Sequence, residues 1–534
     1  MWVTALSEFF SRRQIELSFV ISWVLTGFLY VVAFPPYNAP EAAFVFLAPF
    51  FLWLRRHPSL KVVGIGSFVV FWFGWIVLVF WLRHVTLLGT FLLAGFVAAH
   101  LSIFCVGAAW LAKRSLKQGP WMGCVFAVGV AVLWVVLEHV RSWVFTGFPW
   151  LPLAATQWDR PIMLQSASFV GAWGVSFVLV LLNAGIASYA VRIYEFAKSK
   201  KKTFCPEFYF SLIIFVGATF MMARQTTGQN REALMRAAVL QPVIPQDQKW
   251  DEAFATDILH RLFRNSVLLK PMKADVLFWP EASIPYPLKG DPIIRQWAEG
   301  LADQMEIPIV AGALGIELEA GEDETDLFSN SVFLVRPKWG LHPTYYSKRH
   351  LVPFGEYIPL RDFWPWMTKV VPLSGDFLPG EKPVLIPLNL EEKTVNVGSL
   401  ICYEDIFPNL ARSMVLEGAG MFFVASNSAW YGQEGAAAQH MAHSVLRAVE
   451  TRRIIIRVGN DGWTGWIDEY GNVQDEFEMW EIGGTAWELS RDSRWIGRDT
   501  PYVKNGDWFV WLCYGLAGAI GIFAWMRFRS QSPL

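Results

Sequence analysis

The feature that most constrains this chain is a series of apolar segments long enough to cross a membrane. Seven segments contain no Asp, Glu, Lys or Arg, and they cover residues 17–34, 62–82, 85–112, 121–137, 166–191, 208–223 and 508–526. A helix of about 20 apolar residues spans the hydrocarbon core of a bilayer. An eighth segment, residues 42–54, is shorter and contains Pro49. We therefore expect a polytopic α-helical bundle of eight spans.

Basic residues on the connecting loops predict the orientation of these spans. They fall on alternate loops, as the pairs and clusters Arg12 with Arg13, Arg55 with Arg56, Lys113 with Arg114, residues 198–202, and Arg527 with Arg529. Loops rich in Lys and Arg stay on the cytoplasmic side of a membrane. Both termini are then cytoplasmic, and the long segment between the last two spans is extracytoplasmic. The short segment 42–54 has to cross for this alternation to hold.

Composition agrees with this interpretation and excludes other classes of protein. Hydrophobic residues make up 54% of the 534 residues, which is too many for a soluble enzyme of this size. The net charge of −1 provides no basic surface for a nucleic acid. The five cysteines include no pair placed for a disulfide, and no Cys/His set has the spacing of a zinc site. We expect no nucleic-acid partner and no metal or organic cofactor.

The segment between residues 224 and 507 has a different pattern. Charged residues return, and short apolar runs alternate with amphipathic stretches. The predicted strands cover residues 235–243, 274–278, 307–314, 329–335, 395–401, 421–425 and 454–458, and the predicted helices cover residues 251–270, 292–305, 409–417 and 436–452. Strands that alternate with helices favour an α/β layered domain. We therefore divide the chain into spans 1–7 (residues 1–223), an extracytoplasmic α/β domain (residues 224–507), and span 8 with a cytoplasmic tail (residues 508–534).

Three residues of this α/β domain have positions that suit covalent acyl transfer. Cys402 follows a predicted strand and precedes a predicted helix, where amide dipoles favour the thiolate that attacks carbonyls. Glu281 and Lys348 also stand at strand ends. A lone cysteine is more often a small buried hydrophobe, and a Glu/Lys pair is often a surface ion pair worth about 0–1 kcal/mol. The combination of thiol, carboxylate and ammonium at strand ends favours an acyl-transfer site.

The motifs around these residues resemble the Glu-Lys-Cys signature of the carbon-nitrogen hydrolase (nitrilase) superfamily. They are Trp279-Pro280-Glu281-Ala282, Lys348 with Leu351-Val352-Pro353-Phe354-Gly355-Glu356, and Cys402-Tyr403-Glu404. Flanking residues are closer to the membrane branch of that superfamily, the bacterial apolipoprotein N-acyltransferases, as in Thr146-Gly147-Phe148-Pro149-Trp150, Lys249-Trp250-Asp251 and Thr500-Pro501-Tyr502. The resemblance covers nearly the whole chain. Three motifs in this order, between predicted membrane spans, are a specific indication of the family.

The resemblance implies a fold, a location and a reaction. It implies an αββα nitrilase-like domain between the last two of eight spans, in the bacterial inner membrane and facing the periplasm. The family moves a fatty acyl chain from a phospholipid, expected to be phosphatidylethanolamine, to the N-terminal amine of a diacylated lipoprotein. Cys402 would form a thioester, Glu281 would transfer the protons, and Lys348 would stabilise the oxyanion. No cofactor is implied, and we expect a monomer.

The resemblance also points to four supporting residues. Glu356 and Glu404 would orient Lys348 and its surroundings, although Glu404 is also compatible with an ordinary structural carboxylate. Tyr403 either lines the acyl path or packs in the interior. Trp250 resembles the family's substrate-gating tryptophan, and an interfacial anchor is the alternative in a chain with 28 tryptophans.

The sequence does not decide the roles of several further residues. The family usually has Asp where Ser428 stands, and its Asn-Asn-Gly is here Asn460-Asp461-Gly462, which bears on substrate fit rather than on the reaction type. We expect His100, within the fourth span, to be a packed polar residue. Glu138 and Arg141 are one helical turn apart, so we expect them to pair, with contact to a lipid head group as the alternative.

Two other functions are compatible with the same motifs. In a membrane-bound amidase of the nitrilase type, water would enter and hydrolyse the thioester, whereas an acyltransferase excludes water and admits an amine. Eight spans favour the transferase, because a simple anchor needs only one. A non-catalytic lipid- or lipoprotein-binding relative would keep the fold, and the intact Glu281, Lys348 and Cys402 argue against it.

Overall fold

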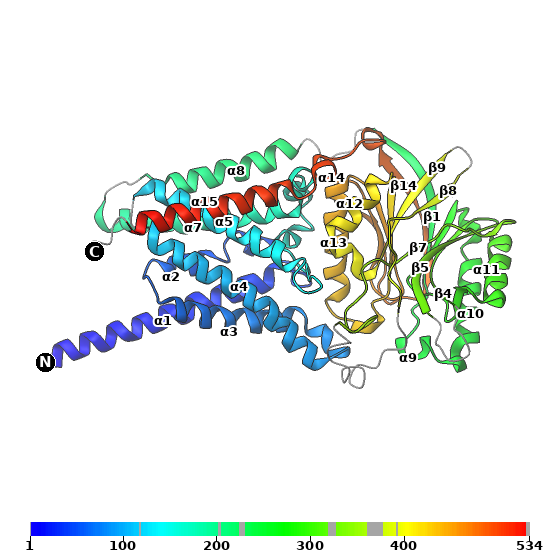
Figure 1. Cartoon of the computed structure of the whole chain (residues 1–534), viewed down its shortest axis with the longest axis horizontal. Helices are drawn as coiled ribbons and strands as arrows, with labels where there is room; N and C mark the ends of the chain where they lie inside the picture. Colours follow the sequence, from blue (N-terminus) through cyan, green and yellow to red (C-terminus); the bar gives the residue numbers. More distant parts are fainter. Residues whose placement is uncertain are drawn as a thin grey trace. The chain divides into compact units, whose positions relative to one another are not determined.

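The chain forms two compact units. The computed structural model describes residues 2–116, 119–200, 204–223, 230–318, 327–359, 377–390 and 393–529. One unit comprises residues 1–226 and 507–534, and the other comprises residues 227–506. The first unit is helical, and the second combines helices with β-sheets (Figure 1).

The helical unit contains long and short helices. The long ones are α1 (Trp2–Ala33), α3 (Leu60–Leu78), α4 (Leu87–Ser115), α5 (Pro120–Arg141), α7 (Ala167–Ser199), α8 (Pro206–Ala223) and α15 (Trp508–Arg529). The short ones are η1 (Pro40–Phe44), α2 (Ala48–Leu54), η2 (Phe80–His84), η3 (Leu153–Gln157) and α6 (Pro161–Leu164).

Five helices of the described ranges are long and apolar enough to cross a membrane. Their apolar stretches are Leu60–Leu78, Leu87–Ser115, Trp121–Arg141, Ala167–Ser199 and Trp508–Met526. Three other apolar helical stretches are shorter, namely Leu17–Ala33, Pro40–Leu54 and Pro206–Thr219. The predicted polytopic helical architecture is therefore confirmed, and the number of eight crossings stays a prediction.

Helix α7 forms the centre of this unit. Within its most apolar stretch 78% of the residues are buried, compared with 17% for α15. Asn183, on α7, is fully buried and supports the break between η1 and α2. Its side chain donates to the carbonyl of Ala43 and accepts from the amide of Leu47, each at 2.8 Å. Because backbone groups inside a bilayer cannot bond to water, an interrupted helix needs such a partner.

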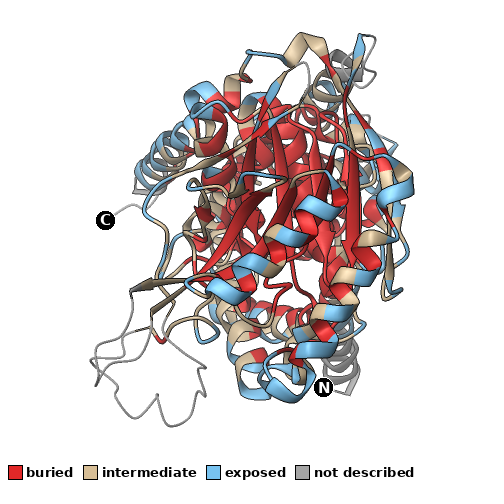
Figure 2. Ribbon diagram, turned by 90° about the vertical axis from the view of Figure 1, so that its right-hand side faces the viewer, coloured by how far each residue is buried: buried red, intermediate tan, exposed pale blue. Residues whose placement is uncertain are grey.

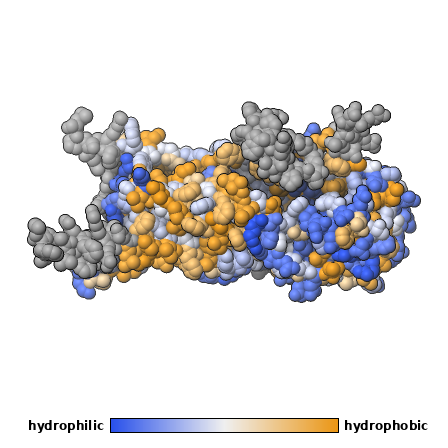
Figure 3. All heavy atoms as spheres, turned by 90° about the horizontal axis from the view of Figure 1, so that it is seen from below, coloured by the Kyte–Doolittle hydropathy of each residue, from blue (hydrophilic) through white to orange (hydrophobic). Residues whose placement is uncertain are grey.

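The outer surface of the helical unit is apolar. Leu88, Leu92, Ile213 and Trp511 are each about two-thirds exposed. Figure 3 shows apolar side chains gathered over the helices of this unit, whereas the surface of the second unit is mostly polar. Soluble monomers rarely expose contiguous apolar patches larger than a few hundred Å². A surface of this kind is suited to contact with lipid.

The second unit contains two β-sheets. The first sheet has the strand order β14-β1-β2-β4-β5-β6, with β3 beside β4 and β7 beside β5, and the second has the order β13-β12-β11-β10-β9-β8. The first sheet comprises β1 (Arg231–Gln241), β2 (Val276–Trp279), β3 (Pro287–Lys289), β4 (Ile309–Leu318), β5 (Leu327–Arg336), β6 (Gly340–Leu341), β7 (Tyr346–Ser347) and β14 (Gly483–Asp492). The second comprises β8 (Leu385–Asn389), β9 (Thr394–Ile401), β10 (Met421–Ser426), β11 (Ile455–Gly459), β12 (Thr464–Ile467) and β13 (Val473–Phe477).

Helices cover the outer faces of the two sheets. The helices of this unit are α9 (Gln246–Lys249), α10 (Glu252–Val267), η4 (Lys270–Met272), α11 (Pro292–Met305), η6 (Cys402–Ile406), α12 (Pro408–Leu416), η7 (Ala429–Tyr431), α13 (Ala436–Thr451), η8 (Ser493–Trp495) and α14 (Pro501–Asn505). Helices α10 and α11 lie on one side of the sheets, and α12 and α13 lie on the other (Figure 1).

The core lies between the sheets and beneath the helices. Phe278 of β2 packs against Phe423 of β10, with ring centroids 4.9 Å apart, so the two sheets face each other. Ile258 and Leu262 of α10 are buried, while the opposite face of that helix is exposed (Figure 2). This arrangement is the predicted αββα nitrilase-like fold.

Parallel strands determine where functional groups gather in this fold. Strand β2 runs parallel to β1 and β4, and β10 runs parallel to β9 and β11. The carboxyl ends of parallel strands meet at one edge of a sheet, which is where α/β proteins bind ligands. Glu281 follows β2 and Cys402 follows β9, so both residues lie at such an edge.

Candidate active site

Glu281 lies in the turn that follows β2. The side chain is 7% exposed, and the side-chain amide of Asn330 donates a hydrogen bond to its Oε1 at 2.8 Å. The ammonium of Lys348 is 3.6 Å from the same oxygen. Because both partners contact Oε1, Oε2 is the oxygen that remains to accept a proton. Strand β4 supports the turn closely, since a Cβ added to Gly312 would lie 2.4 Å from the carbonyl oxygen of Pro280.

Lys348 follows β7 and is almost fully buried. Its Nζ donates a hydrogen bond to Oε1 of Glu356 at 2.8 Å, and its backbone amide donates to the carbonyl of Asn330 at 2.8 Å. Burial opposes the charge, but the carboxylates of Glu356 and Glu281 outweigh it and raise the pKa of this ammonium above its ordinary value. Lys348 therefore carries a positive charge at neutral pH.

Asn330, on β5, connects these residues, and no motif in the sequence identifies it. Its Nδ2 donates to Oε1 of Glu281 at 2.8 Å and to Oε1 of Glu356 at 3.2 Å. The run Ser329-Asn330-Ser331 could have pointed to Asn330, because it places three buried polar side chains within an apolar strand. Buried polar groups require hydrogen-bond partners, so such a run indicates a polar site beside the strand.

Cys402 begins η6 directly after β9. Its φ of 49° places a non-glycine residue in the left-handed region, a strained conformation that clusters at functional sites. The side chain is 6% exposed, and the backbone amide of Asn427 hydrogen-bonds the thiol. Cys402 lies within electrostatic range of both Glu281 and Lys348. The structure thus brings the three residues into one cluster.

The amide dipoles of the helix start do not dominate the protonation of Cys402. Burial, reinforced by the neighbouring carboxylate of Glu281, raises the pKa of the Cys402 thiol well above its ordinary value, and Lys348 offsets this only in part. Helix η6 has only five residues, and the effect of a helix dipole is modest. The thiol is therefore protonated at neutral pH and needs a base to react.

Glu404 connects the turn after Cys402 to the segment that carries Lys348. Its carboxylate is fully buried and accepts hydrogen bonds from the hydroxyl of Tyr346 and from the backbone amides of Arg349, His350 and Ile401. Glu404 therefore positions the backbone on both sides of the site. Glu356, by contrast, contacts the ammonium of Lys348 itself.

A buried ion-pair network lies next to the same turn. Asp405 is fully buried and accepts hydrogen bonds from Arg457 of β11 and Ser444 of α13. Arg457 also donates to the hydroxyl of Ser426, at the end of β10, at 3.0 Å. Removing one member of such a network leaves a buried charge without compensation. The network therefore holds η6, β10, β11 and α13 in one fixed arrangement.

Tyr403 and Trp250 have different surroundings. Tyr403 is 8% exposed and packs edge-on against Phe407, with ring centroids 5.2 Å apart, which agrees with a packing role. Trp250 follows α9 and is 43% exposed, and the Nζ of Lys249 lies 6.0 Å from the centroid of its ring. Its exposure suits a side chain that contacts substrate, and the gating role stays a prediction.

The two departures from the family pattern lie beside each other. The backbone amide of Ser428 hydrogen-bonds the carboxylate of Asp461, and a Cβ added to Gly462 would lie 2.6 Å from the hydroxyl of Ser428. Burial raises the pKa of Asp461 to about 6, although the charge of Lys249 and that amide oppose it. Lys249 is fully buried, and its Nζ donates to the carbonyl of Glu281 at 3.1 Å. Burial lowers the pKa of this lysine to about 8.

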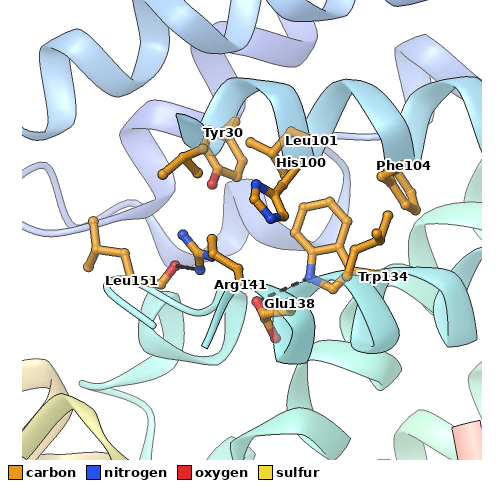
Figure 4. Close-up of a pocket in the computed structure, with 10 residues that line it drawn as sticks. Tyr30, His100, Leu101, Phe104, Trp134, Glu138, Arg141 and Leu151 are labelled. Carbon is orange, nitrogen blue, oxygen red and sulfur yellow. Dashed lines mark hydrogen bonds between the residues drawn. The ribbon is translucent and has the colours of Figure 1, made fainter. Parts of the chain in front are cut away.

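A small cavity with a mostly apolar lining lies within the helical unit. Figure 4 shows His100, Glu138 and Arg141 around it. Glu138 accepts from the amide of Leu153 at 2.7 Å, and Arg141 donates to the carbonyl of Leu151 at 3.5 Å. The cavity holds about 20 Å³, which is room for about one water molecule and too little for a lipid head group. Glu138 and Arg141 thus hold the loop that follows α5.

The cluster in the α/β unit has the chemistry of acyl transfer. It contains a nucleophilic sulfur, a carboxylate that can take its proton, and a fixed cation. Moving the proton from Cys402 to Glu281 leaves the net charge of the cluster unchanged and places the new negative charge near Lys348. Among the described residues, no group of three or more His, Cys, Asp or Glu is arranged to hold a metal ion.

Two protein families match long stretches of this chain. Residues 26–185 match the apolipoprotein N-acyltransferase N-terminal domain, and residues 236–486 match the carbon-nitrogen hydrolase family. Together the two matches cover more than half of the chain. The chain belongs to the apolipoprotein N-acyltransferase family.

Relatives in the apolipoprotein N-acyltransferase family match both units. The apolipoprotein N-acyltransferase of Geobacter metallireducens is 28% identical over 94% of this chain and 95% of its own length. That of Methylococcus capsulatus is 28% identical over 92% of this chain and 94% of its own length. Among solved structures, an amidase from Nesterenkonia sp. is 16% identical, with a TM-score of 0.36, over 53% of this chain and 97% of its own. The chain is thus similar to N-acyltransferases along nearly its whole length.

Because Gly312 lies so close to the turn that carries Glu281, a side chain at position 312 should slow the alkylation of Cys402. Gly312→Ala should displace Glu281, because the added Cβ would lie 2.8 Å from the Cα of Glu281. A general base contributes about 10²–10⁴-fold to a rate, so we expect iodoacetamide to alkylate Cys402 at least about tenfold more slowly, as measured by mass spectrometry. Gly300→Ala is the matched control, since nothing lies within 4 Å of its added Cβ. Equal alkylation rates in the two variants would show that the turn tolerates the methyl group.

Asn330→Asp tests how the charges of Glu281, Glu356 and Lys348 are balanced in the site. The change keeps the shape of the side chain but adds a third carboxylate between Glu281 and Glu356 and removes the donor to both. Like charges disfavour ionisation of a neighbour, so the pKa of the Cys402 thiol should rise further. The pH profile of alkylation should move to higher pH. Asn389→Asp, at an exposed position of β8, is the control. A profile that coincides with wild type would mean that Asn330 does not set the charge balance.

Proposed function

We propose that this chain is a phospholipid:apolipoprotein N-acyltransferase. It transfers a fatty acyl chain from a membrane phospholipid to the free N-terminal amine of diacylglyceryl-cysteine lipoproteins, the last step of their maturation. One observation carries this proposal: matches to the N-acyltransferase family run through both units, and within them a buried thiol, carboxylate and ammonium form one cluster. The helical unit supplies the contact with lipid that a phospholipid donor requires.

In the first half-reaction, Glu281 takes the proton of Cys402 as the sulfur attacks the ester carbonyl of the phospholipid. Burial raises the pKa of this thiol, so the thiolate forms only while Glu281 holds the proton. The carbon–sulfur bond forms, the ester carbon–oxygen bond breaks, and Glu281 gives its proton to the leaving glycerol oxygen. A lysophospholipid departs and an acyl thioester on Cys402 remains.

In the second half-reaction, the lipoprotein amine attacks the thioester. Glu281 accepts a proton from the attacking nitrogen, the carbon–sulfur bond breaks, and the proton passes to the sulfur, which restores the thiol. The product is an amide, which is more stable than the thioester. Lys348 keeps its charge in both halves, because Glu356 and Glu281 raise its pKa, and it stabilises each oxyanion.

Other residues contribute by positioning these groups. Glu356 holds the ammonium of Lys348 at 2.8 Å, and Glu404 holds the backbone around both Lys348 and Cys402. Trp250, half exposed beside Lys249, gates the substrate. The donor is phosphatidylethanolamine, the acceptor is a diacylated lipoprotein, and the enzyme acts as a monomer. Residues 224–507 carry the chemistry, and residues 1–223 and 508–534 form the membrane spans.

Trapping the acyl intermediate tests this proposal. Purified protein mixed with a phospholipid that carries a labelled acyl chain should acquire the label on Cys402 when no acceptor is present. Adding a diacylglyceryl-cysteine peptide should then move the label to the peptide as an amide. Cys402→Ala should acquire no label, because no other group replaces the thiol. Mass spectrometry of the peptide that contains Cys402 measures both steps.

The outcomes of this experiment separate the alternatives. Cys402→Ser, which keeps the size of the side chain, should form an ester slowly and turn over poorly. Release of the label to water without an amine would assign an amidase. A wild-type protein that never acquires label would be a lipid-binding relative. Amide produced by Cys402→Ala would exclude the covalent scheme.

The proposed reaction requires the α/β unit to lie outside the cytoplasmic membrane. The lipoprotein amine is exposed only after export, so the site faces the periplasm from the inner membrane. The alternating basic loops support this orientation, since Lys113 with Arg114 and residues 198–202 are expected on the cytoplasmic side.

Cysteine labelling tests the orientation. In a variant that lacks the five native cysteines, Glu417→Cys and Lys198→Cys introduce thiols at exposed positions of the α/β unit and of α7. A membrane-impermeant maleimide should label Glu417→Cys on intact spheroplasts and Lys198→Cys only after permeabilisation. The two variants are controls for each other, because each thiol is exposed. The reverse pattern would invert the topology and exclude the proposed acceptor.

A further inference from the structure

Asp461 is a buried carboxylate that the proposed reaction does not use. It follows β11, in the turn before β12, and is 8% exposed. Its Oδ1 has no hydrogen-bond partner among the described residues. Buried polar atoms of native proteins are nearly always hydrogen-bonded. Such an oxygen can accept a hydrogen bond from a water molecule or from a donor group of a ligand.

Asp461 lies close to the reacting sulfur. The backbone amide of Asn427 hydrogen-bonds the thiol of Cys402, and the amide of the next residue, Ser428, hydrogen-bonds the carboxylate of Asp461. Amides of consecutive residues are within roughly 4 Å of each other, and each hydrogen bond adds about 3 Å. The sulfur and the carboxylate are thus on the order of 10 Å apart at most. The acyl carbon attached to the sulfur and an amine hydrogen-bonded to the carboxylate can together bridge a gap of this order.

The turn that carries Asp461 is rigidly held. Asn460, the preceding residue, accepts from the amide of Ile244 at 3.0 Å and donates to the carbonyl of Ile244 at 2.8 Å. It also donates to the side chain of Asn427 at 3.1 Å. The turn, the segment that leads to α9 and the end of β10 therefore form one hydrogen-bonded assembly, so Asp461 is in place before any ligand arrives.

The chemistry of this position favours a cationic ligand. An ionised carboxylate only accepts hydrogen bonds, and its strongest partner is a charged N–H donor. The nearby cation, Lys249, donates to the carbonyl of Glu281 at 3.1 Å. A peptide N-terminus is an ammonium group with three donors, and its pKa of about 7.7–8.0 keeps much of it charged at neutral pH.

We propose that Asp461 binds the α-ammonium group of the incoming acceptor next to the acylated Cys402. This inference rests on the proposed function and specifies how the second substrate is recognised. The carboxylate raises the local concentration of the acceptor at the thioester. The ammonium has no lone pair, so it first gives one proton to water, and the neutral amine then attacks. The carboxylate gives no comparable advantage to water, which carries no charge. Asp461 is therefore a binding residue of the second half-reaction and has no part in the first.

Separate measurement of the two half-reactions tests this role. Asp461→Asn removes the charge and keeps the shape of the side chain. Acylation of Cys402 by labelled phospholipid should proceed at the wild-type rate. Transfer to a diacylglyceryl-cysteine peptide should show a KM raised about tenfold to a hundredfold, the loss expected for a hydrogen bond to a charged group. Glu417→Gln, which removes an exposed negative charge from the same unit, should change neither step.

An uncharged nucleophile provides the decisive comparison. Hydroxylamine, which is largely uncharged at neutral pH, should discharge the thioester of Asp461→Asn and of wild type equally fast. An unchanged KM for the peptide would overturn the proposal, and so would an equal loss with hydroxylamine or a loss of thioester formation. Failure of the proposed function looks different, because the wild-type protein itself would then form no thioester.

Discussion

The site depends on one buried cation, the ammonium of Lys348. Two carboxylates and a thiol surround it, and without its charge the carboxylates of Glu281 and Glu356 would repel each other in a low-dielectric environment. Asn330 completes the balance by donating to both. The positive charge makes a proton transfer from Cys402 to Glu281 possible, since the new negative charge on sulfur forms near an existing cation. Strand β5, strand β7 and the turn after β2 hold Asn330, Lys348 and Glu281 together.

The reactive cysteine is kept in a strained conformation by interactions that are themselves buried. A positive φ at Cys402 is unfavourable for a residue with a side chain. Glu404 opposes the relaxation of this turn by holding the backbone before and after it, and the network of Asp405 with Arg457 fixes the strands on which it rests. Buried ion pairs contribute little net stability. Their value here is that the thiol occupies one position relative to Glu281 and Lys348.

The sequence predicts elements with strong local signals and fails where tertiary structure decides. Helix α11 has the predicted limits 292–305, because Asp291 caps it and its apolar residues recur with helical spacing. The sequence does not predict strand β14, because its partner β1 is far away in the chain and half of its residues are polar. The motifs identify Glu281, Lys348, Cys402 and their carboxylates, which the structure brings together. Asn330 has no motif of its own. The helix start at Cys402 favours the thiolate, whereas burial, which no local pattern encodes, raises the pKa of the thiol.

The high pKa of the Cys402 thiol bears on whether the acyl group is transferred to an amine or hydrolysed by water. A cysteine that stays protonated at rest reacts slowly with electrophiles. In the proposed reaction it reacts fast only when a carbonyl lies against the sulfur and Glu281 takes the proton. The same burial that raises this pKa limits the access of water to the thioester once it has formed. In the proposed reaction, hydrolysis requires a water molecule to enter a nearly dry site, whereas an amine bound at Asp461 would already be in place. Burial of Cys402 therefore agrees with acyl transfer where the site holds the acceptor amine and not water beside the sulfur.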